Sequence, residues 1–294
     1  MHATSSFDVS LPSRKHPMSD ANPKTVIVVP AYNEAKRLNV EAFREFLGVR
    51  AHANVGFVFV NDGSLDNTEE LLRGLCRSSE PGRVRAISMQ TNVGKAEAVR
   101  VGMLESMNGG EAYIGYWDAD LAAPLDEIAH IARSFKRNPT CAIAMGSRVK
   151  LLGRNIQRKA ARHYLSRFFA TAVSIALSLP VYDTQCGAKL FPVSDETRAL
   201  FAQPFLTRWI FDVELLARFV RLRLDAGQSM DDLAESIQEI PLYSWRDVAG
   251  SKIKASDIIA AVLQLGAIYF RYLRRRAGAV YDIVRVDTAW SWLE

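Results

Sequence analysis

Short apolar runs alternate with amphipathic stretches through the first half of the chain. Five runs rich in β-branched and aromatic residues predict buried strands, at residues 24–30, 56–60, 83–89, 112–117 and 141–145. Between them, apolar residues recur at helical spacing and predict helices, at residues 39–52, 66–76, 95–107 and 124–136. Alternating strands and helices are typical of a mainly parallel sheet with helices on both faces. The pattern therefore predicts an α/β fold with a Rossmann-like sheet.

The second half of the chain has a different pattern. It predicts a long helix over residues 157–179, a loop and short strand over 183–191, a helix within 207–223 and a strand over 237–243. An apolar helix over residues 258–270 follows, and arginines come directly after it. We therefore expect a disordered leader at residues 1–22, one α/β domain at residues 23–254 and a C-terminal helical extension at residues 255–294.

Composition and charge narrow the class of protein. The 294 residues are 49% hydrophobic and 23% charged, as in ordinary globular proteins, and the net charge is +5. A positive excess favours anionic partners such as nucleotides, phospholipid surfaces or nucleic acids. The three cysteines are widely spaced and form no C-x-x-C pair, which argues against a disulfide framework or a zinc site and fits a reducing cytosol. The leader lacks the apolar segment of a secretory signal, and no apolar run reaches the roughly 20 residues needed to span a bilayer.

Two acids separated by one residue follow the fourth predicted strand. Side chains i and i+2 lie on the same side of an extended backbone, so Asp118 and Asp120 can present two carboxylates together. Such a pair repels itself unless a cation lies between the carboxylates, and a hard divalent cation that also binds substrate phosphates fits. The alternative is an ordinary strand-to-loop turn with two solvated acids.

Polar clusters follow all five of these strands. They are Tyr32–Glu34, Asp62, Asn92–Lys95, Asp118 with Asp120, and Arg148. Ligands of parallel α/β sheets bind at the carboxyl ends of the strands, so these side chains predict a binding site at one edge of the sheet. Asp62 is placed to accept hydrogen bonds from a base or ribose.

Several common motifs are missing from the sequence. It contains no G-x-x-x-x-G-K-[ST] P-loop, no G-x-G-x-x-G after the first strand, no G-x-S-x-G and no H-E-x-x-H. Their absence disfavours P-loop enzymes, dinucleotide-binding enzymes, α/β-hydrolases and zinc peptidases. The sequence therefore predicts a nucleotide site without a P-loop.

Five stretches in order resemble the GT-A fold of family 2 inverting glycosyltransferases: VVPAYNEAKRL, FVNDGSLDNT, NVGKAEAVRVGM, DADLAAP and GSR. The stretches DTQCGAKLF, RWIFDVELL and EIPLYSW, followed by GSK, resemble dolichyl-phosphate β-glucosyltransferases and their polyprenyl-phosphate relatives, which are related to dolichyl-phosphate mannose synthase. The similarity covers residues 24–254. It implies metal-dependent, inverting transfer of a hexose, with UDP-glucose as the favoured donor, onto a polyprenyl phosphate.

The resemblance also implies roles for individual residues. Those expected to bind the nucleotide sugar are Pro30, Ala31, Tyr32, Asn33, Glu34, Asp62, Lys95 and Asp118. Those expected to bind the acceptor phosphate are Arg148, Arg208 and Lys252. Those expected to be catalytic are Asp120, Asp183, Gln185 and Arg208, and Asp118 and Asp120 are expected to bind Mg²⁺ or Mn²⁺. A lipid phosphate is already anionic and needs no general base, whereas a sugar hydroxyl needs one. Asp183 is the first candidate for that base, and a turn-capping role for it is equally open.

Alternatives remain for the reaction and for the location of the protein. The same fold could use GDP-mannose, transfer a sugar to a soluble or glycan hydroxyl, or bind a nucleotide sugar without catalysis. Residues 158–179 and 258–276 place arginines beside apolar helices, as interfacial membrane helices do, although core or dimer helices have the same pattern. We expect a cytoplasmic protein, and peripheral contact with the inner face of the cytoplasmic membrane is the open possibility. Nucleic acid is not an expected partner because no RNA-binding motif is present. The sequence leaves the oligomeric state open.

Overall fold

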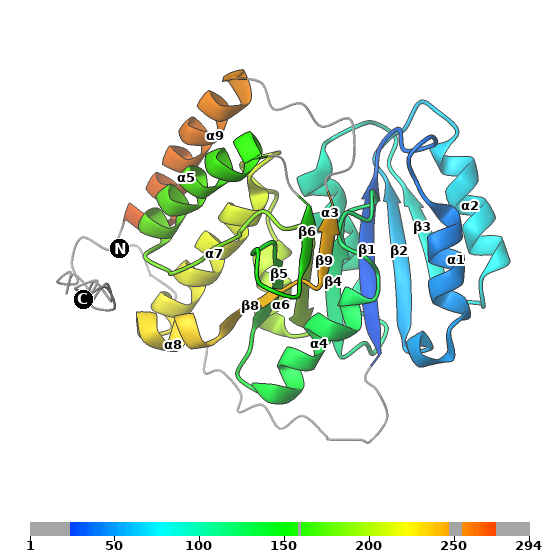
Figure 1. The fold of residues 1–294 in the computed structure, drawn as a ribbon, viewed down its shortest axis with the longest axis horizontal. Helices are drawn as coiled ribbons and strands as arrows, with labels where there is room; N and C mark the ends of the chain where they lie inside the picture. Colours follow the sequence, from blue (N-terminus) through cyan, green and yellow to red (C-terminus); the bar gives the residue numbers. More distant parts are fainter. Residues whose placement is uncertain (1–23, 158–159, 247–254, 275–294) are drawn as a thin grey trace, which may run out of the picture.

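A seven-stranded sheet lies at the centre of the structure, a computed structural model (Figure 1), in the order β3-β2-β1-β4-β7-β5-β8. Its strands are β1 (Thr25–Ala31), β2 (Val55–Asn61), β3 (Val84–Ser88), β4 (Tyr113–Trp117), β5 (Ile143–Ser147), β7 (Ala188–Pro192) and β8 (Ile237–Pro241). The short strands β6 (Asn155–Gln157) and β9 (Ser244–Arg246) pair in parallel as a second sheet. The structure describes residues 24–157, 160–246 and 255–274, and side chains within them except for residues 160–166 and 255–259. The predicted leader and Lys252 lie outside the described residues.

Only β7 runs against its neighbours in the central sheet. It is antiparallel to both β4 and β5, whereas β1 pairs in parallel with β2 and β4, β2 with β3, and β5 with β8. The carboxyl ends of the other strands therefore share one edge with the beginning of β7. The predicted α/β fold with a mainly parallel sheet is confirmed, and the reversal of β7 delivers the loop at residues 183–187 to the same edge.

Helices cover both faces of this sheet. They are α1 (Val40–Gly48), α2 (Thr68–Ser78), α3 (Lys95–Ser106), α4 (Glu127–Arg137), α5 (Ala160–Leu177), α6 (Asp195–Phe201), α7 (Phe211–Asp225), α8 (Met230–Glu235) and α9 (Ala255–Ile268). A 3₁₀ turn at Arg50–His52 follows α1, and a π-helical turn, η2 (Tyr269–Leu273), continues α9. The predicted helix over residues 157–179 is wrong at its start, because residues 155–157 pair with β9 and the helix begins at Ala160.

The alternation of side chains along β1 builds two apolar cores. Val26 and Val28 face the core beneath α3, α5, α7 and α9, and Ile27 and Val29 face the core beneath α1, α2 and α4. Alternate strand residues point to opposite faces of a sheet, and burial on both faces explains why the strands read as continuous apolar runs. These two cores fix the strand ends, and hence the loops that carry the polar clusters.

The C-terminal helix packs onto the α/β domain. Ala261, Ile268 and Leu273 are buried in the core on the α7 side of the sheet. The proposed boundary at residues 254 and 255 adjoins residues 247–254, outside the described part, and stays a prediction. Among the helices that the structure describes, none has the length and apolar character needed to cross a membrane.

Candidate active site

The predicted site residues lie at one edge of the sheet, where the loops after β1, β2, β3, β4 and β5 meet the loop that enters β7. Hydrogen bonds join the first two of these loops. The amide of Asn33 donates to Oγ of Ser64 (3.0 Å), and the amide of Leu65 donates to Oδ1 of Asn33 (2.9 Å). The amide of Glu34 donates to Oγ1 of Thr68 (2.8 Å). The backbone after β1 is therefore held in place by the backbone after β2.

The residues predicted after β1 differ in what they expose. Pro30 and Ala31 are the last residues of β1, and Ala31 is buried. The Glu34 carboxylate accepts two hydrogen bonds from the guanidinium of Arg37, at 2.6 and 2.9 Å. Tyr32, by contrast, exposes 43% of its surface. Its ring is the group in this segment that is open to a nucleoside, a role that stays a prediction.

Asp62 organises the loop in front of α3. Its side chain is buried, and it accepts hydrogen bonds from Nδ2 of Asn92 (2.8 Å) and from the amides of Val93 (2.9 Å) and Gly94 (2.9 Å). Both carboxylate oxygens are thus engaged within the protein. The sequence placed Asp62 at the correct edge, but the loop it holds was not foreseen, because that contact joins residues about thirty positions apart.

Lys95 and Asp118 form an ion pair at the centre of this edge. Nζ of Lys95, the first residue of α3, lies 2.5 Å from Oδ1 of Asp118, and both side chains are partly exposed. Burial alone would lower the pKa of Lys95, but nearby carboxylates, chiefly Asp118 and Asp212, outweigh burial and raise the pKa above its ordinary value. Lys95 therefore stays charged at neutral pH and can face an anionic ligand.

Asp120 lies next to this pair in a turn that follows β4, in which the Leu121 amide donates to the Asp118 carbonyl (3.2 Å), and not on the extended backbone that the i+2 spacing assumed. Its Oδ1 accepts a hydrogen bond from the amide of Ala122 (3.1 Å), and Leu121 between them adopts a left-handed backbone conformation (φ 51°). Burial and the charge of Asp118 raise the pKa of Asp120. Burial is the larger of these two causes, and repulsion from the Asp118 carboxylate adds to it.

The two acids fit a divalent cation that shares its ligands with a substrate. Mg²⁺ and Mn²⁺ prefer oxygen ligands, and Mg²⁺ is usually bound by one or two carboxylates plus substrate phosphates and water. No group of three or more histidine, cysteine, aspartate or glutamate side chains within the described ranges could hold a metal ion. Asp118 and Asp120 are therefore suited to a metal–diphosphate site rather than to a cage formed by the protein alone.

Gly187 allows the Asp118 carboxylate to lie where it does. The Asp118 amide donates to the carbonyl oxygen of Gly187 (3.0 Å), and a Cβ at position 187 would lie only 2.0 Å from Oδ2 of Asp118. Sequence reasoning noticed the DTQCG stretch but not this glycine. The lack of a side chain there was a signal, since glycine often marks a close approach of backbone to another group.

Arg148 and Asp183, predicted separately, bind each other. Nε and Nη2 of Arg148 each lie 2.6 Å from a carboxylate oxygen of Asp183, and the Arg148 amide donates to the same carboxylate (3.0 Å). Burial works against the charge of Arg148, but Asp183 keeps the pKa of Arg148 above its ordinary value. The face of the Trp245 ring lies 5.3 Å from the guanidinium carbon of Arg148. This geometry favours a structural role for Asp183, in which it holds Arg148, over a role as general base.

Two of the remaining predicted residues, Gln185 and Arg208, lie in loops that the structure describes. Gln185 is half-buried in the loop before β7. Arg208 is exposed, and its Nε donates to the carbonyl of Val93 (3.0 Å), two residues before Lys95. The structure thus places the Arg208 side chain against the loop that carries Lys95. Lys252 cannot be placed, because it lies outside the described residues.

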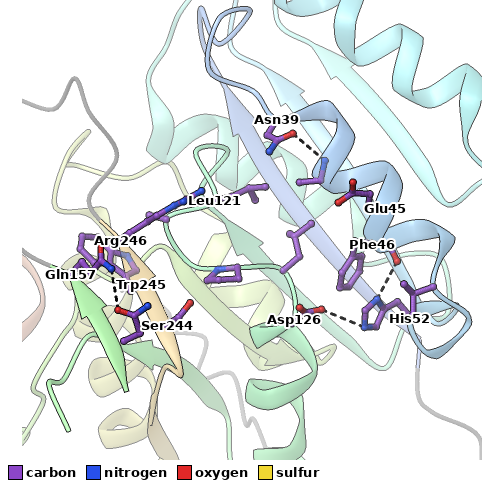
Figure 2. A pocket seen from close by; sticks show the side chains of 16 residues that line it. Asn39, Glu45, Phe46, His52, Leu121, Asp126, Gln157, Ser244, Trp245 and Arg246 are labelled. Atoms are coloured by element: carbon purple, nitrogen blue, oxygen red, sulfur yellow. Dashed lines mark hydrogen bonds and ion pairs between the residues drawn. The ribbon is translucent and has the colours of Figure 1, made fainter. Parts of the chain in front are cut away.

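A groove of about 580 Å³ adjoins the acids on the α1 side (Figure 2). It lies between α1, the loop at residues 121–126 and the β6–β9 sheet, and Leu121 and Ala122 bring it directly to Asp120. Phe46 and Trp245 line it together with polar groups such as Glu45 and Arg246. The groove gives the site an open side next to the proposed metal ligands.

Comparison with known families decides the class of protein. Residues 26–196 match the sequence profile described as Glycosyl transferase family 2, which covers more than half of the chain. The chain belongs to glycosyl transferase family 2. The predicted family is therefore confirmed, and with it the prediction of a hexosyltransferase.

Relatives of this family 2 glycosyltransferase extend the match beyond the profile. The chain is 34% identical to a dolichyl-phosphate beta-glucosyltransferase of Trichomonas vaginalis, over 84% of this chain and 72% of that protein. It is 31% identical to the dolichyl-phosphate beta-glucosyltransferase of Saccharomyces cerevisiae, over 90% and 79% of the two chains, and 32% identical to that of Homo sapiens, over 74% and 70%.

A solved structure supports the fold of this glycosyltransferase. Glucosyl-3-phosphoglycerate synthase of Mycobacterium tuberculosis, in complex with Mn²⁺, UDP-glucose and glycerol 3-phosphate, superimposes with a TM-score of 0.56. The match covers 84% of this chain and 78% of that chain at 17% identity. At this identity the similarity supports a GT-A-like fold alone.

Proposed function

We propose that this enzyme transfers glucose from UDP-glucose to a polyprenyl phosphate with inversion at the anomeric carbon. The observation that carries the proposal is the length of the similarity to the dolichyl-phosphate beta-glucosyltransferases. It spans 74–90% of the chain, further than the family profile at residues 26–196. The similarity is therefore not limited to the part that the profile covers.

Charges at the sheet edge suit departure of the nucleoside diphosphate. Mg²⁺ or Mn²⁺ held by Asp118 and Asp120 would stabilise the negative charge that develops on the leaving group. Lys95, which pairs with Asp118 at 2.5 Å, supplies a second positive charge at the same place. The sugar then develops the oxocarbenium character typical of glycosyl transfer.

The hydrogen bonds of Asp183 favour a phosphate acceptor over a hydroxyl acceptor. A hydroxyl needs a carboxylate base within hydrogen-bonding reach, and Asp183 is instead engaged by three donors from Arg148. A lipid phosphate needs only positive charge to position it, and the exposed guanidinium of Arg208 lies beside the Lys95 loop. We assign Arg208 to the acceptor phosphate and Arg148 to fixing the loop before β7.

Product analysis tests the proposed reaction. With radiolabelled UDP-glucose, polyprenyl phosphate and Mn²⁺, we expect label in an organic-extractable, acid-labile lipid, and EDTA should stop the transfer until Mn²⁺ is restored. Label that enters only a water-soluble product would show a hydroxyl acceptor. Faster transfer from GDP-mannose than from UDP-glucose would identify GDP-mannose as the donor. Binding of UDP-glucose without transfer would show a nucleotide-sugar-binding protein without catalytic activity.

An exposed apolar face on α5 and α9 fits the surface of a membrane that contains this acceptor. The two helices lie along the same side of the molecule (Figure 1), and η2, the continuation of α9, packs against α5. Their exposed apolar side chains are Phe168, Ile175, Val262, Leu263 and Phe270, each at least 57% exposed. Exposed arginines at 271 and 274 end this face. An apolar stripe bordered by cationic side chains is typical of helices that lie in the membrane interface.

Serine substitutions on this face should weaken membrane binding. We expect Phe168→Ser/Ile175→Ser/Leu263→Ser to lower binding to anionic vesicles about tenfold or more in a flotation assay, since each large apolar side chain contributes roughly 1.5–3 kcal/mol when buried. Val49→Ser/Leu152→Ser, which changes exposed apolar residues outside these helices, is the matched control. Unchanged flotation with a loss of dimers on gel filtration would instead make the face a subunit contact.

A further inference from the structure

A buried charged cluster that the reaction described above does not use includes Tyr116, two residues before Asp118. Lys189 of β7 is fully buried, and its Nζ lies 2.5 Å from Oδ1 of Asp212, in the first turn of α7. The hydroxyl of Tyr116, in β4, donates to the same oxygen at 2.5 Å. One carboxylate oxygen thus joins two neighbouring strands and a helix.

Stability alone is a poor explanation for this cluster. Removing two charges from water costs free energy that their attraction often fails to return, and apolar residues of similar volume commonly stabilise a core as well or better. Phe211 and Phe191, which pack around the Tyr116 ring, show that the surrounding core is apolar. The charged pair therefore calls for a role beyond filling space.

The second hydrogen bond of Lys189 leads to the active site. Nζ of Lys189 donates to the carbonyl oxygen of Cys186 at 2.7 Å. The next residue, Gly187, accepts the amide of Asp118 and leaves its carboxylate the space of a missing Cβ. Lys189 thus fixes the peptide unit on the N-terminal side of Gly187, and Gly187 is the residue that Asp118 contacts.

The start of α7, where Asp212 lies, is also close to Lys95. Lys95 lies 5.8 Å from the ring centroid of Phe211, the neighbour of Asp212. The bonds of Asp212 to Lys189 and Tyr116 hold the start of α7, and with it the Phe211 ring beside Lys95.

We propose that Lys189 and Asp212 are positioning residues of the transferase, which set Asp118 through the Cys186–Gly187 peptide and keep Lys95 directed at the donor. The inference rests on the proposed donor site at Asp118 and Asp120. It assigns a specific effect to the pair: loss of the two charges should impair use of the donor more than it impairs folding.

The test is the double variant Lys189→Met/Asp212→Asn, which removes both charges, nearly preserves volume and leaves Tyr116 an acceptor. With saturating lipid acceptor, we expect kcat/KM for UDP-glucose to fall about 100-fold, the scale of a 1 Å misplacement in an active site, with a raised KM. The Kd for UDP in the presence of Mn²⁺ should rise in parallel. The unfolding temperature reports stability separately.

An ion pair between α7 and α6 is the control. Arg223 of α7 and Glu196 of α6 form a second largely buried ion pair, with side chains 13% and 8% exposed. Arg223→Met/Glu196→Gln can change the unfolding temperature, but kcat/KM for UDP-glucose should stay within about twofold of the parent enzyme. The reason is that no residue proposed to bind the donor contacts this ion pair. Equal losses in both double variants, or wild-type kinetics in Lys189→Met/Asp212→Asn, would overturn the inference.

Two further variants keep the test decisive. If the double variant does not fold, Tyr116→Phe removes one hydrogen bond from Asp212 without changing charge, and it should raise the donor KM several-fold. An unchanged KM there also overturns the inference. Asp118→Asn separates the two proposals, because full activity in that variant would remove the donor site itself, whatever Lys189 and Asp212 do.

Discussion

Asp118→Asn is expected to lower kcat/KM for sugar transfer by about 10³-fold while the unfolding temperature changes little. The Asp118 side chain is 35% exposed and pairs with Lys95, so its charge serves the site more than the core. Loss of one preorganised electrostatic contact to developing charge typically costs about 10²–10³ in rate, and loss of a metal ligand adds to that. Steady-state kinetics with UDP-glucose and thermal unfolding of the same preparations measure both quantities.

Two related substitutions show whether the effect comes from metal binding. Asp120→Asn should abolish both Mn²⁺ binding and sugar transfer. The electron paramagnetic resonance signal of free Mn²⁺ measures the binding. Asp231→Asn is the control, since Asp231 is an exposed acid of α8 outside the groove next to the proposed metal ligands. Wild-type transfer by Asp120→Asn in the presence of metal would refute the assignment of Asp120 as a metal ligand.

The sheet could be predicted from sequence because its signals are local. A run such as TVIVVPA of β1 predicts a strand that is buried on both faces. In a parallel sheet, the residues that follow such strands lie at the same edge of the sheet. The direction of β7 is not local. It depends on pairing with β4, where Trp117 lies opposite Ala188, seventy-one positions later. The loop at residues 183–187 could therefore be named as important but not placed against Asp118.

The same limit applies to the roles of charged side chains. Arg148 was predicted to bind the acceptor phosphate and Asp183 to accept a proton. The two residues lie 35 positions apart in the sequence and bind each other in the structure. Lys189 and Asp212 are 23 positions apart, and neither has a local signal for pairing. A sequence shows which residues could carry chemistry, whereas only the packed structure shows which charges are already neutralised by one another. Lys95 is exposed and Asp118 and Asp120 are partly exposed, so these are the groups that we propose for the substrate.

Gly187→Ala should cause a large loss of transfer, although it changes no functional group. The added Cβ would lie 2.0 Å from Oδ2, 2.1 Å from Cγ and 2.4 Å from Oδ1 of Asp118. A carboxylate is too short to move aside without leaving its position, so the loop or the acid must shift. We expect kcat/KM to fall about 100-fold, as misplacements near 1 Å do, and stability to fall by about 1–3 kcal/mol, as overpacking does.

A second substitution identifies the cause of that loss. In an Asp118→Ala background the carboxylate is gone, so Gly187→Ala should cost little further stability, and a double-mutant cycle should show a coupling free energy close to the whole cost of Gly187→Ala. Gly74→Ala is the matched control, because a Cβ there meets no atom within 4 Å and alanine favours the helix. Additive losses of stability in the cycle would show that Gly187 is required for its own backbone rather than for Asp118, and the close approach would then not be what positions the acid.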